Sequence, residues 1–117
     1  MQLHDLAKMI DHSLLHPTMT DAQITAGCGL ACKHDVATVC VKPYAIDLAQ
    51  RTLEGSNVGI CSVVTFPHGN STMRIKVAET QEALNANNMS SKLSVLVTGT
   101  QRCVVGYLAV EKVIDWD

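Results

Sequence analysis

The chain has 117 residues, of which 47% are hydrophobic and 17% are charged, a composition typical of one compact domain. Nine basic and eleven acidic residues give a formal net charge of −2, which excludes the basic surface that nucleic acids and anionic lipids require. Aromatic residues make up only 3% of the chain, so base-stacking platforms are excluded as well. We therefore expect a single domain over residues 1–117 that binds neither nucleic acid nor membrane.

The expected location is cytoplasmic. No stretch approaches the roughly 20 apolar residues of a membrane span, and polar residues interrupt the first ten positions, where a secretory signal has an apolar run. The cysteines number five, and in a reducing compartment we expect them to be free thiols rather than a disulfide framework. Four of them are predicted to be small buried hydrophobic residues.

The N-terminal third is predicted to contain two helices. Apolar spacing predicts a short amphipathic helix over residues 3–10, followed by a turn-forming stretch over residues 11–17. Thr20, followed three residues later by Gln23, is a capping-box pattern and marks the start of the next helix. That helix is expected to end near His34.

Two buried strands are predicted in the middle of the chain. Residues 36–41 and 58–66 are nearly continuous apolar runs, which is typical of parallel strands covered on both faces. A helical stripe over residues 45–53 lies between them, and a turn at residues 67–70 leads into a further helix. The inward face of this last helix is predicted to consist of Met73, Val77, Thr80 and Leu84.

The end of the chain is harder to interpret. Residues 93–97 are predicted to form a third strand. Residues 105–116 fit a helix, which we favour, but residues 103–110 also fit a strand. The spacing of apolar residues in so short a segment is consistent with both. The alternation of strands and helices predicts βαβ units in either an open doubly wound sheet or part of a (β/α)8 barrel.

Four short motifs distinguish between these two architectures. They are IDHSLLHPT at residues 10–18, VCVKPY at residues 39–44, FPHGN at residues 66–70 and KVAE at residues 76–79. In this order and spacing they resemble the N-terminal part of deoxyribose-phosphate aldolase, a class I aldolase with a (β/α)8 barrel. The resemblance covers residues 3–86 and implies an α/β fold, a partial TIM barrel with parallel strands. Since a complete barrel takes about 250 residues, we expect a truncated family member with a divergent tail over residues 87–117.

The resemblance also implies a reaction. The family reversibly cleaves 2-deoxy-D-ribose 5-phosphate to D-glyceraldehyde 3-phosphate and acetaldehyde through a lysine Schiff base, without metal or other cofactor. The Schiff-base lysine and the lysine that tunes it belong to later strands, and Ser94 or Lys92 stands where an acidic residue is expected. We therefore expect this chain alone to be weakly active or inactive. The alternative is a catalytically inactive, oligomeric or ligand-binding remnant of the fold.

Asp11 and Lys42 are the candidate catalytic residues. Asp11 matches the acidic residue of the family's proton relay, although hydrogen bonding to the local backbone explains its position equally well. Reactive groups of parallel barrels lie at the carboxyl ends of strands, and Lys42 is the only lysine that directly follows a predicted strand. A solvated loop lysine is the alternative interpretation.

Five residues match positions that line the family's substrate pocket. They are Ser13, Leu15, Cys40, Val63 and Phe66. Plain core packing is an equally good interpretation of the three apolar ones. Cys40 is expected to lie close to the bound aldehyde, with an inert buried thiol as the alternative.

No metal site is expected from the sequence. His12 and His16 have an H-x-x-x-H spacing but lack the glutamate of a zinc-protease helix. Cys28 and Cys32 lie four residues apart, and no C-x-x-C pair occurs. We interpret these residues as structural or surface residues.

The expected partners are a small aldehyde or sugar phosphate and further copies of the chain. A partial barrel has unpaired strand edges and an uncovered inner sheet face. We expect that face to carry Val39, Val41, Ile60 and Val63. Association into a homodimer or larger homo-oligomer would cover it.

Overall fold

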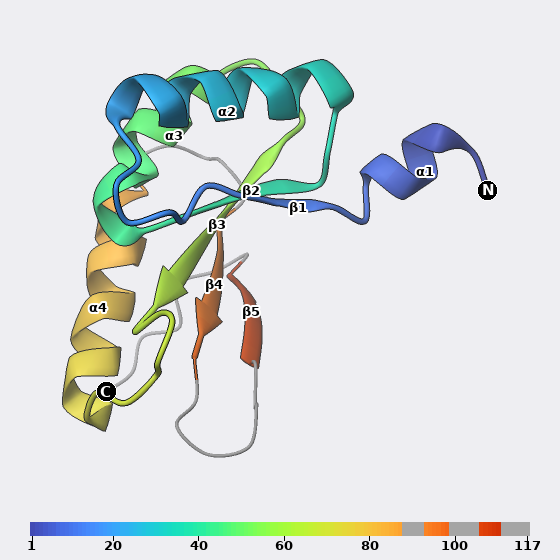
Figure 1. The fold of residues 1–117 in the computed structure, drawn as a ribbon. Coiled ribbons are helices and arrows are strands. Elements are labelled where there is room, and N and C mark those ends of the chain that lie inside the picture. The colour runs from blue at the N-terminus through green and yellow to red at the C-terminus, as the bar shows by residue number, and fades with distance from the viewer. Residues whose placement is uncertain (88–92, 99–105, 111–117) are drawn as a thin grey trace.

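The structure is a computed structural model and describes residues 1–87, 93–98 and 106–110. It consists of one five-stranded sheet, in the order β1-β2-β3-β4-β5, with helices packed against it (Figure 1). The strands are β1 (Asp11–Ser13), β2 (Thr38–Val41), β3 (Gly59–Val64), β4 (Leu93–Val97) and β5 (Gly106–Val110). The helices are α1 (Leu3–Ala7), α2 (Asp21–His34), a 3-10 turn η1 (Pro43–Ala45), α3 (Ile46–Leu53) and α4 (Met73–Ala86). No helix in these ranges is long and apolar enough to cross a bilayer.

Strands β1 to β4 are parallel, as predicted, whereas β5 is antiparallel to β4. The favoured helix over residues 105–116 is therefore wrong at residues 106–110, and the remainder of that segment lies outside the described residues. The connection from β4 to β5 is shorter than the dozen or more residues that a parallel crossover requires. A strand that pairs with the open edge of β4 after so short a connection is expected to run antiparallel.

Strand β1 lies in a stretch that we predicted to be a turn. Asp11 pairs with Thr38 and Ser13 with Cys40, and the N–H of Leu14 donates to the carbonyl of Cys40 at 2.8 Å. Three polar residues carry neither the alternation nor the apolar run that predicts a strand. The strand exists because β2 supplies its hydrogen-bond partners.

Helix α2 begins and ends where the sequence predicted. The N–H of Gln23 donates to Thr20 Oγ1 at 3.3 Å, and the N–H of Thr20 donates to Gln23 Oε1 at 2.8 Å, which completes the capping box. At the other end Asp35 adopts a left-handed conformation with φ of 47°. Lys8 holds Asp35 in place through a 2.7 Å ion pair, and the hydrogen bond from Lys8 lowers the pKa of the Asp35 carboxyl.

The inward face predicted for α4 is partly wrong. Met73 is 75% exposed and Val77 is 50% exposed, whereas Ala83 is fully buried. Only the C-terminal half of α4 joins the core, through Ala83 together with the partly buried Leu84 and Ala86. The sheet does not extend far enough to cover the apolar residues at the start of this helix.

The two faces of the sheet have different roles. Val39, Val41 and Ile60 point to the helices and form the main core with residues of α2, α3 and α4. The expectation that these three residues line the inner face is therefore wrong. Side chains alternate along a strand, so Cys40 lies on the opposite face from Val39 and Val41, and there it packs with Val63 in a second, smaller cluster.

Candidate active site

A row of four short polar side chains crosses the sheet on the face turned away from the helices. Ser13 pairs with Cys40, Cys40 with Cys61, and Cys61 with Ser94. Residues paired across parallel strands point to the same side of a sheet. Ser94, which stands where the resemblance predicts an acidic residue, therefore lies beside Cys61.

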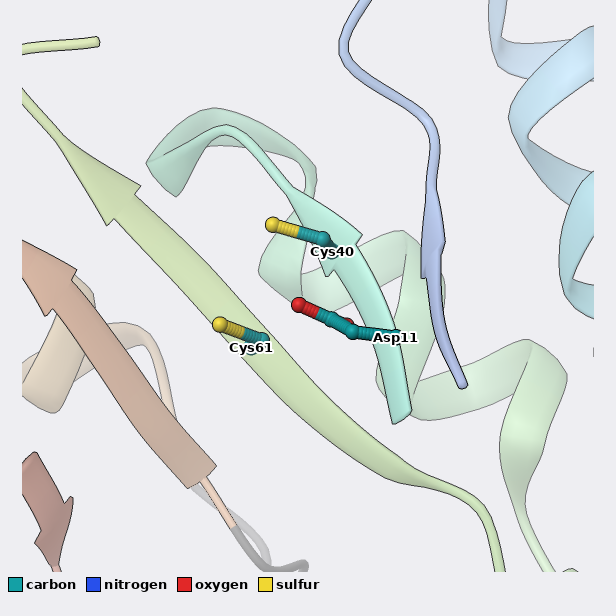
Figure 2. A group of neighbouring side chains, drawn as sticks. All are labelled: Asp11, Cys40 and Cys61. Carbon is teal, nitrogen blue, oxygen red and sulfur yellow. The ribbon is translucent and has the colours of Figure 1, made fainter. Parts of the chain in front are cut away.

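Asp11, Cys40 and Cys61 come together at this face. Their carboxylate and sulfur atoms all lie within 4.8 Å of one another, and Figure 2 shows the three side chains converging on the same side of β2 and β3. Cys40 is 3% exposed and Cys61 is fully buried, while Asp11 is exposed. The hydroxyl of Thr38 donates to Asp11 Oδ1 at 2.5 Å, which orients the carboxylate.

The electrostatics of this cluster keep Cys61 protonated. The hydrogen bond with Cys40 is the largest cause that raises the pKa of the Cys61 thiol, followed by burial and by the negative charges of Cys40 and then Asp11. Thiolate, not thiol, is the nucleophilic form of cysteine. In this cluster Cys61 is therefore a poor nucleophile.

A pocket of about 570 Å³ opens where β2 and β3 end. Its lining residues come from η1, α3, α4 and the ends of these strands, and they are Lys42, Pro43, Tyr44, Asp47, Val63, Phe66, Glu79, Glu82 and Ala86. The pocket thus combines one amine with three carboxylates. Because the carboxylates outnumber the amine, the charge of the pocket disfavours binding of a negatively charged phosphate group.

The loop after β3 is held by side chains of α4. Thr65 has a φ of 55°, a conformation that is strained for a β-branched residue. Its N–H donates to Glu79 Oε2 at 2.9 Å, and its hydroxyl donates to the carbonyl of Thr98 at 3.3 Å. Lys76 Nζ donates to the same carbonyl at 3.0 Å. These contacts fix the backbone that leads into Phe66, whose bond to Pro67 is cis.

The structure divides the predicted site residues between two places. Asp11, Ser13 and Cys40 belong to the row and cluster on the sheet, and Leu15 packs against that cluster. Lys42 and Phe66 line the pocket, and Val63 belongs to both places, because it lines the pocket and also packs with Cys40.

Asp11 and Lys42 are not brought together. Asp11 pairs with Thr38 at the start of β2, whereas Lys42 follows the end of that strand. Four residues of extended strand span about 13 Å. The two candidate catalytic residues therefore lie in different parts of the structure.

Sequence reasoning missed Cys61 and Thr38 beside Asp11 and, in the pocket, the carboxylates of Asp47, Glu79 and Glu82. Cys61 and Thr38 become neighbours of Asp11 only through strand pairing. Glu79 did carry a signal, because it belongs to the KVAE motif quoted for the resemblance.

The histidine pair and the α2 cysteine pair, which we interpreted as structural or surface residues, belong to no group of three potential metal ligands among the described residues. In the part of the chain that the structure describes, the one group of three potential ligands is Asp11, Cys40 and Cys61. His16 instead contacts Thr18, with its Nδ1 atom 2.9 Å from the hydroxyl. Cys28 and Cys32 stay on α2, where Cys28 is fully buried.

Comparison with known proteins identifies the relatives of this chain. No protein-family model matches it. It is 45% identical over 83 residues to the deoxyribose-phosphate aldolase of Rhodopirellula baltica, which covers 71% of this chain and 34% of that protein. It is 39% identical over 101 residues to the enzyme of the same name from Caldanaerobacter subterraneus, which covers 83% of this chain and 44% of that protein.

Solved structures give the same result for the fold. A tetrameric deoxyribose phosphate aldolase from Aeropyrum pernix matches with a TM-score of 0.72 and 26% identity, over 86% of this chain and 41% of that one. A protein described as QR15, an aldolase, matches with a TM-score of 0.67 and 28% identity, over 78% of this chain and 39% of that one.

The four parallel strands alternating with helices therefore define the chain as part of an aldolase barrel. Sequence identity and fold together place it in one family. The chain belongs to the deoxyribose-phosphate aldolase family, and it spans between a third and a half of the length of the curated relatives it matches.

Proposed function

We propose that this chain supplies one wall of a site for reversible aldol cleavage, and that 2-deoxy-D-ribose 5-phosphate, the family substrate, is the molecule cleaved. The chain has slow aldolase activity of its own in this proposal, and Lys42 is the reacting amine. The observation that carries the proposal is the position of Lys42. It directly follows β2 and lines the pocket at the carboxyl end of the sheet together with Val63 and Phe66. That end of a parallel barrel holds the reactive groups of enzymes with this fold.

The other described lysines are less suitable. Lys8 is paired with Asp35 at 2.7 Å, and Lys76 is bound to the Thr98 carbonyl at 3.0 Å. Lys33 is exposed in the last turn of α2. Lys42 is therefore the described amine best placed to meet a carbonyl in the pocket.

The proposed reaction follows class I aldolase chemistry. The neutral amine of Lys42 attacks C1 of the open-chain sugar, and water leaves as the iminium forms. The C2–C3 bond then breaks, its electron pair forms an enamine, and the C3 hydroxyl loses its proton to become the aldehyde of D-glyceraldehyde 3-phosphate. Protonation of C2 and hydrolysis release acetaldehyde and restore the amine.

Asp11 has a supporting part in this proposal. Because it is about 13 Å away along the strand, it acts on water and hydroxyl groups deeper in the sheet face rather than directly on Lys42. Ser13 and Cys40 lie in the adjacent row and Leu15 packs beside them. We assign these three residues to the substrate-facing wall.

A cleavage assay tests the proposal. Chain in excess over 2-deoxy-D-ribose 5-phosphate is expected to release D-glyceraldehyde 3-phosphate slowly, because Lys42 is the one described basic residue that lines the pocket and it is engaged with C1, which leaves the phosphate without a basic partner there. The Lys42→Ala variant should lose the activity, Asp11→Asn should lower it by about tenfold or more, and Lys33→Ala should retain it. Absence of product from folded protein would reject the catalytic proposal in favour of a non-catalytic remnant.

We further propose that residues 1–117 form one domain and that copies of it associate. The pairing of β5 with β4 supports a single unit. Met73 and Val77 lie one turn apart on α4 and are 75% and 50% exposed, and neighbouring exposed apolar side chains favour contact with another protein surface. Light scattering is expected to give the mass of a dimer or larger assembly, and a monodisperse monomer would contradict this.

A further inference from the structure

The pocket at the ends of β2 and β3 is acidic on its solvent side. Asp47 and Glu82 line it and are exposed, whereas Lys42 and Glu79 are partly buried. Asp47 belongs to the first turn of α3 and Glu82 to α4, so the two exposed carboxylates come from different helices. A molecule that is attached to the Lys42 amine and points out of the pocket therefore extends toward carboxylates.

The described cations do not compensate for this charge. Lys42 is the one basic residue among the described residues that line the pocket. Lys76, the lysine of α4, donates from Nζ to the Thr98 carbonyl at 3.0 Å and does not line the pocket. Once Lys42 forms an imine with C1 of a sugar, a phosphate on C5 has no described cation beside it in the pocket.

The pocket is large enough to hold a whole sugar. Its volume of about 570 Å³ is typical of small-molecule sites, so both ends of a five-carbon chain lie near the same carboxylates. A phosphate monoester carries nearly two negative charges at neutral pH, and carboxylates within a Debye length of about 8 Å repel it. The protonated imine on Lys42 is a cation, which the same carboxylates stabilise.

We propose that Asp47 and Glu82 make this pocket selective for uncharged aldehydes, so that unphosphorylated 2-deoxy-D-ribose reacts at Lys42 in preference to its 5-phosphate. The selectivity rests on the proposed function, because it takes Lys42 as the reacting amine. Glu79 adds negative charge, but it also accepts the N–H of Thr65 at 2.9 Å. Asp47 and Glu82 are therefore the carboxylates whose removal tests the charge without removing that hydrogen bond.

Competitive trapping on Lys42 measures the selectivity without requiring turnover. The folded chain is incubated with equal concentrations of 2-deoxy-D-ribose and its 5-phosphate. The amine adds to C1, water leaves as the imine forms, and borohydride delivers hydride to C1 to give a stable secondary amine. The two adducts on the Lys42 peptide differ in mass by the phosphate group. Nα-acetyl-lysine amide in the same sample gives a reference ratio, because the two sugars differ in their open-chain fraction.

The ratio of unphosphorylated to phosphorylated adduct on Lys42 is expected to exceed the reference ratio by about tenfold at low salt. It should approach the reference at about 1 M salt, where the Debye length is about 3 Å. The double variant Asp47→Asn and Glu82→Gln should lower the ratio by about threefold or more. The matched control, Asp21→Asn and Glu54→Gln, removes the same charge at exposed positions that do not line the pocket and should keep the ratio.

The possible failures are distinguishable. A ratio equal to the reference or below it would overturn the selectivity and leave Lys42 as an imine-forming amine. An unchanged ratio in the folded Asp47 and Glu82 double variant would overturn the assignment to these two residues. An adduct with acetaldehyde but with neither sugar would overturn the selectivity alone. Absence of any adduct on Lys42 would overturn the proposed function and the selectivity with it.

Discussion

At the scale of single residues, Cys28 couples the stability of the fold to alkaline pH. Burial, and then the negative charge of Cys32, raises the pKa of its thiol from 9.0 to about 11. Between these values the unfolded chain loses the proton and the folded chain keeps it, so the free energy of unfolding falls as pH rises. We expect a loss of on the order of 1–2 kcal/mol across this interval.

Urea unfolding on either side of this interval checks the expectation. The Cys28→Ala variant is the comparison, since it retains all other groups that titrate in the same range. Its stability should decline less steeply with pH than that of the unchanged chain. Equal slopes for the two proteins would show that Cys28 ionises alike in the folded and unfolded states.

Glu79 is expected to stabilise the strained loop after β3. It accepts the N–H of Thr65 at 2.9 Å, and loss of such an acceptor leaves a partly buried donor unpaired. Glu79→Ala should lower the free energy of unfolding by about 1–3 kcal/mol. Glu79→Gln keeps an acceptor oxygen and should cost less.

Thermal unfolding of these variants gives the measurement, and Glu82→Ala provides the control. Glu82 is exposed on the same helix, so its removal is expected to change stability little. If the alanine and glutamine variants of Glu79 unfold alike, the hydrogen bond to Thr65 contributes nothing to stability.

At the scale of elements, two glycines of α2 allow the effect of close packing on stability to be measured apart from the effect of helix propensity. A Cβ atom on Gly27 would lie 2.3 Å from Leu14 Cδ2, whereas one on Gly29 would meet nothing within 4 Å. Gly27→Ala should therefore destabilise the chain by about 1–3 kcal/mol through overpacking. Gly29→Ala should stabilise it by about 1 kcal/mol, since alanine is the better helix former.

Equilibrium unfolding of the two variants tests this prediction, because the two changes in the free energy of unfolding are expected to have opposite signs. Both changes lie in one helix and add the same methyl group, so differences in composition cannot account for opposite effects. A stabilising Gly27→Ala change would mean that α2 does not pack closely on Leu14.

The elements that sequence predicted best are those with local signals. The capping box at Thr20 and the apolar runs that became β2 and β3 need no distant partner to be recognised. Strand β1 and strand β5 are defined by pairing with β2 and β4, which periodicity does not report. The exposure of Met73 depends likewise on how far the sheet extends, not on the helix itself.

At the scale of the whole molecule, the parallel sheet explains both what was predicted about the site and what was missed. Motif resemblance identified Asp11 and Cys40, and the position directly after a predicted strand identified Lys42. The register then placed Asp11 with Cys61 and left Lys42 in a separate pocket. A cluster of side chains drawn from β1, β2 and β3 has no characteristic spacing in sequence, so only the folded sheet reveals it.

Trapping of an imine on Lys42 tests the central claim most directly. The folded chain is incubated with a stoichiometric amount of acetaldehyde and reduced with borohydride, and the adduct is mapped by peptide mass. We predict one adduct on Lys42 that is absent in Lys42→Ala and retained in Lys33→Ala. Absence of an adduct, or equal labelling in Lys42→Ala, would contradict the claim that this chain carries an imine-forming amine.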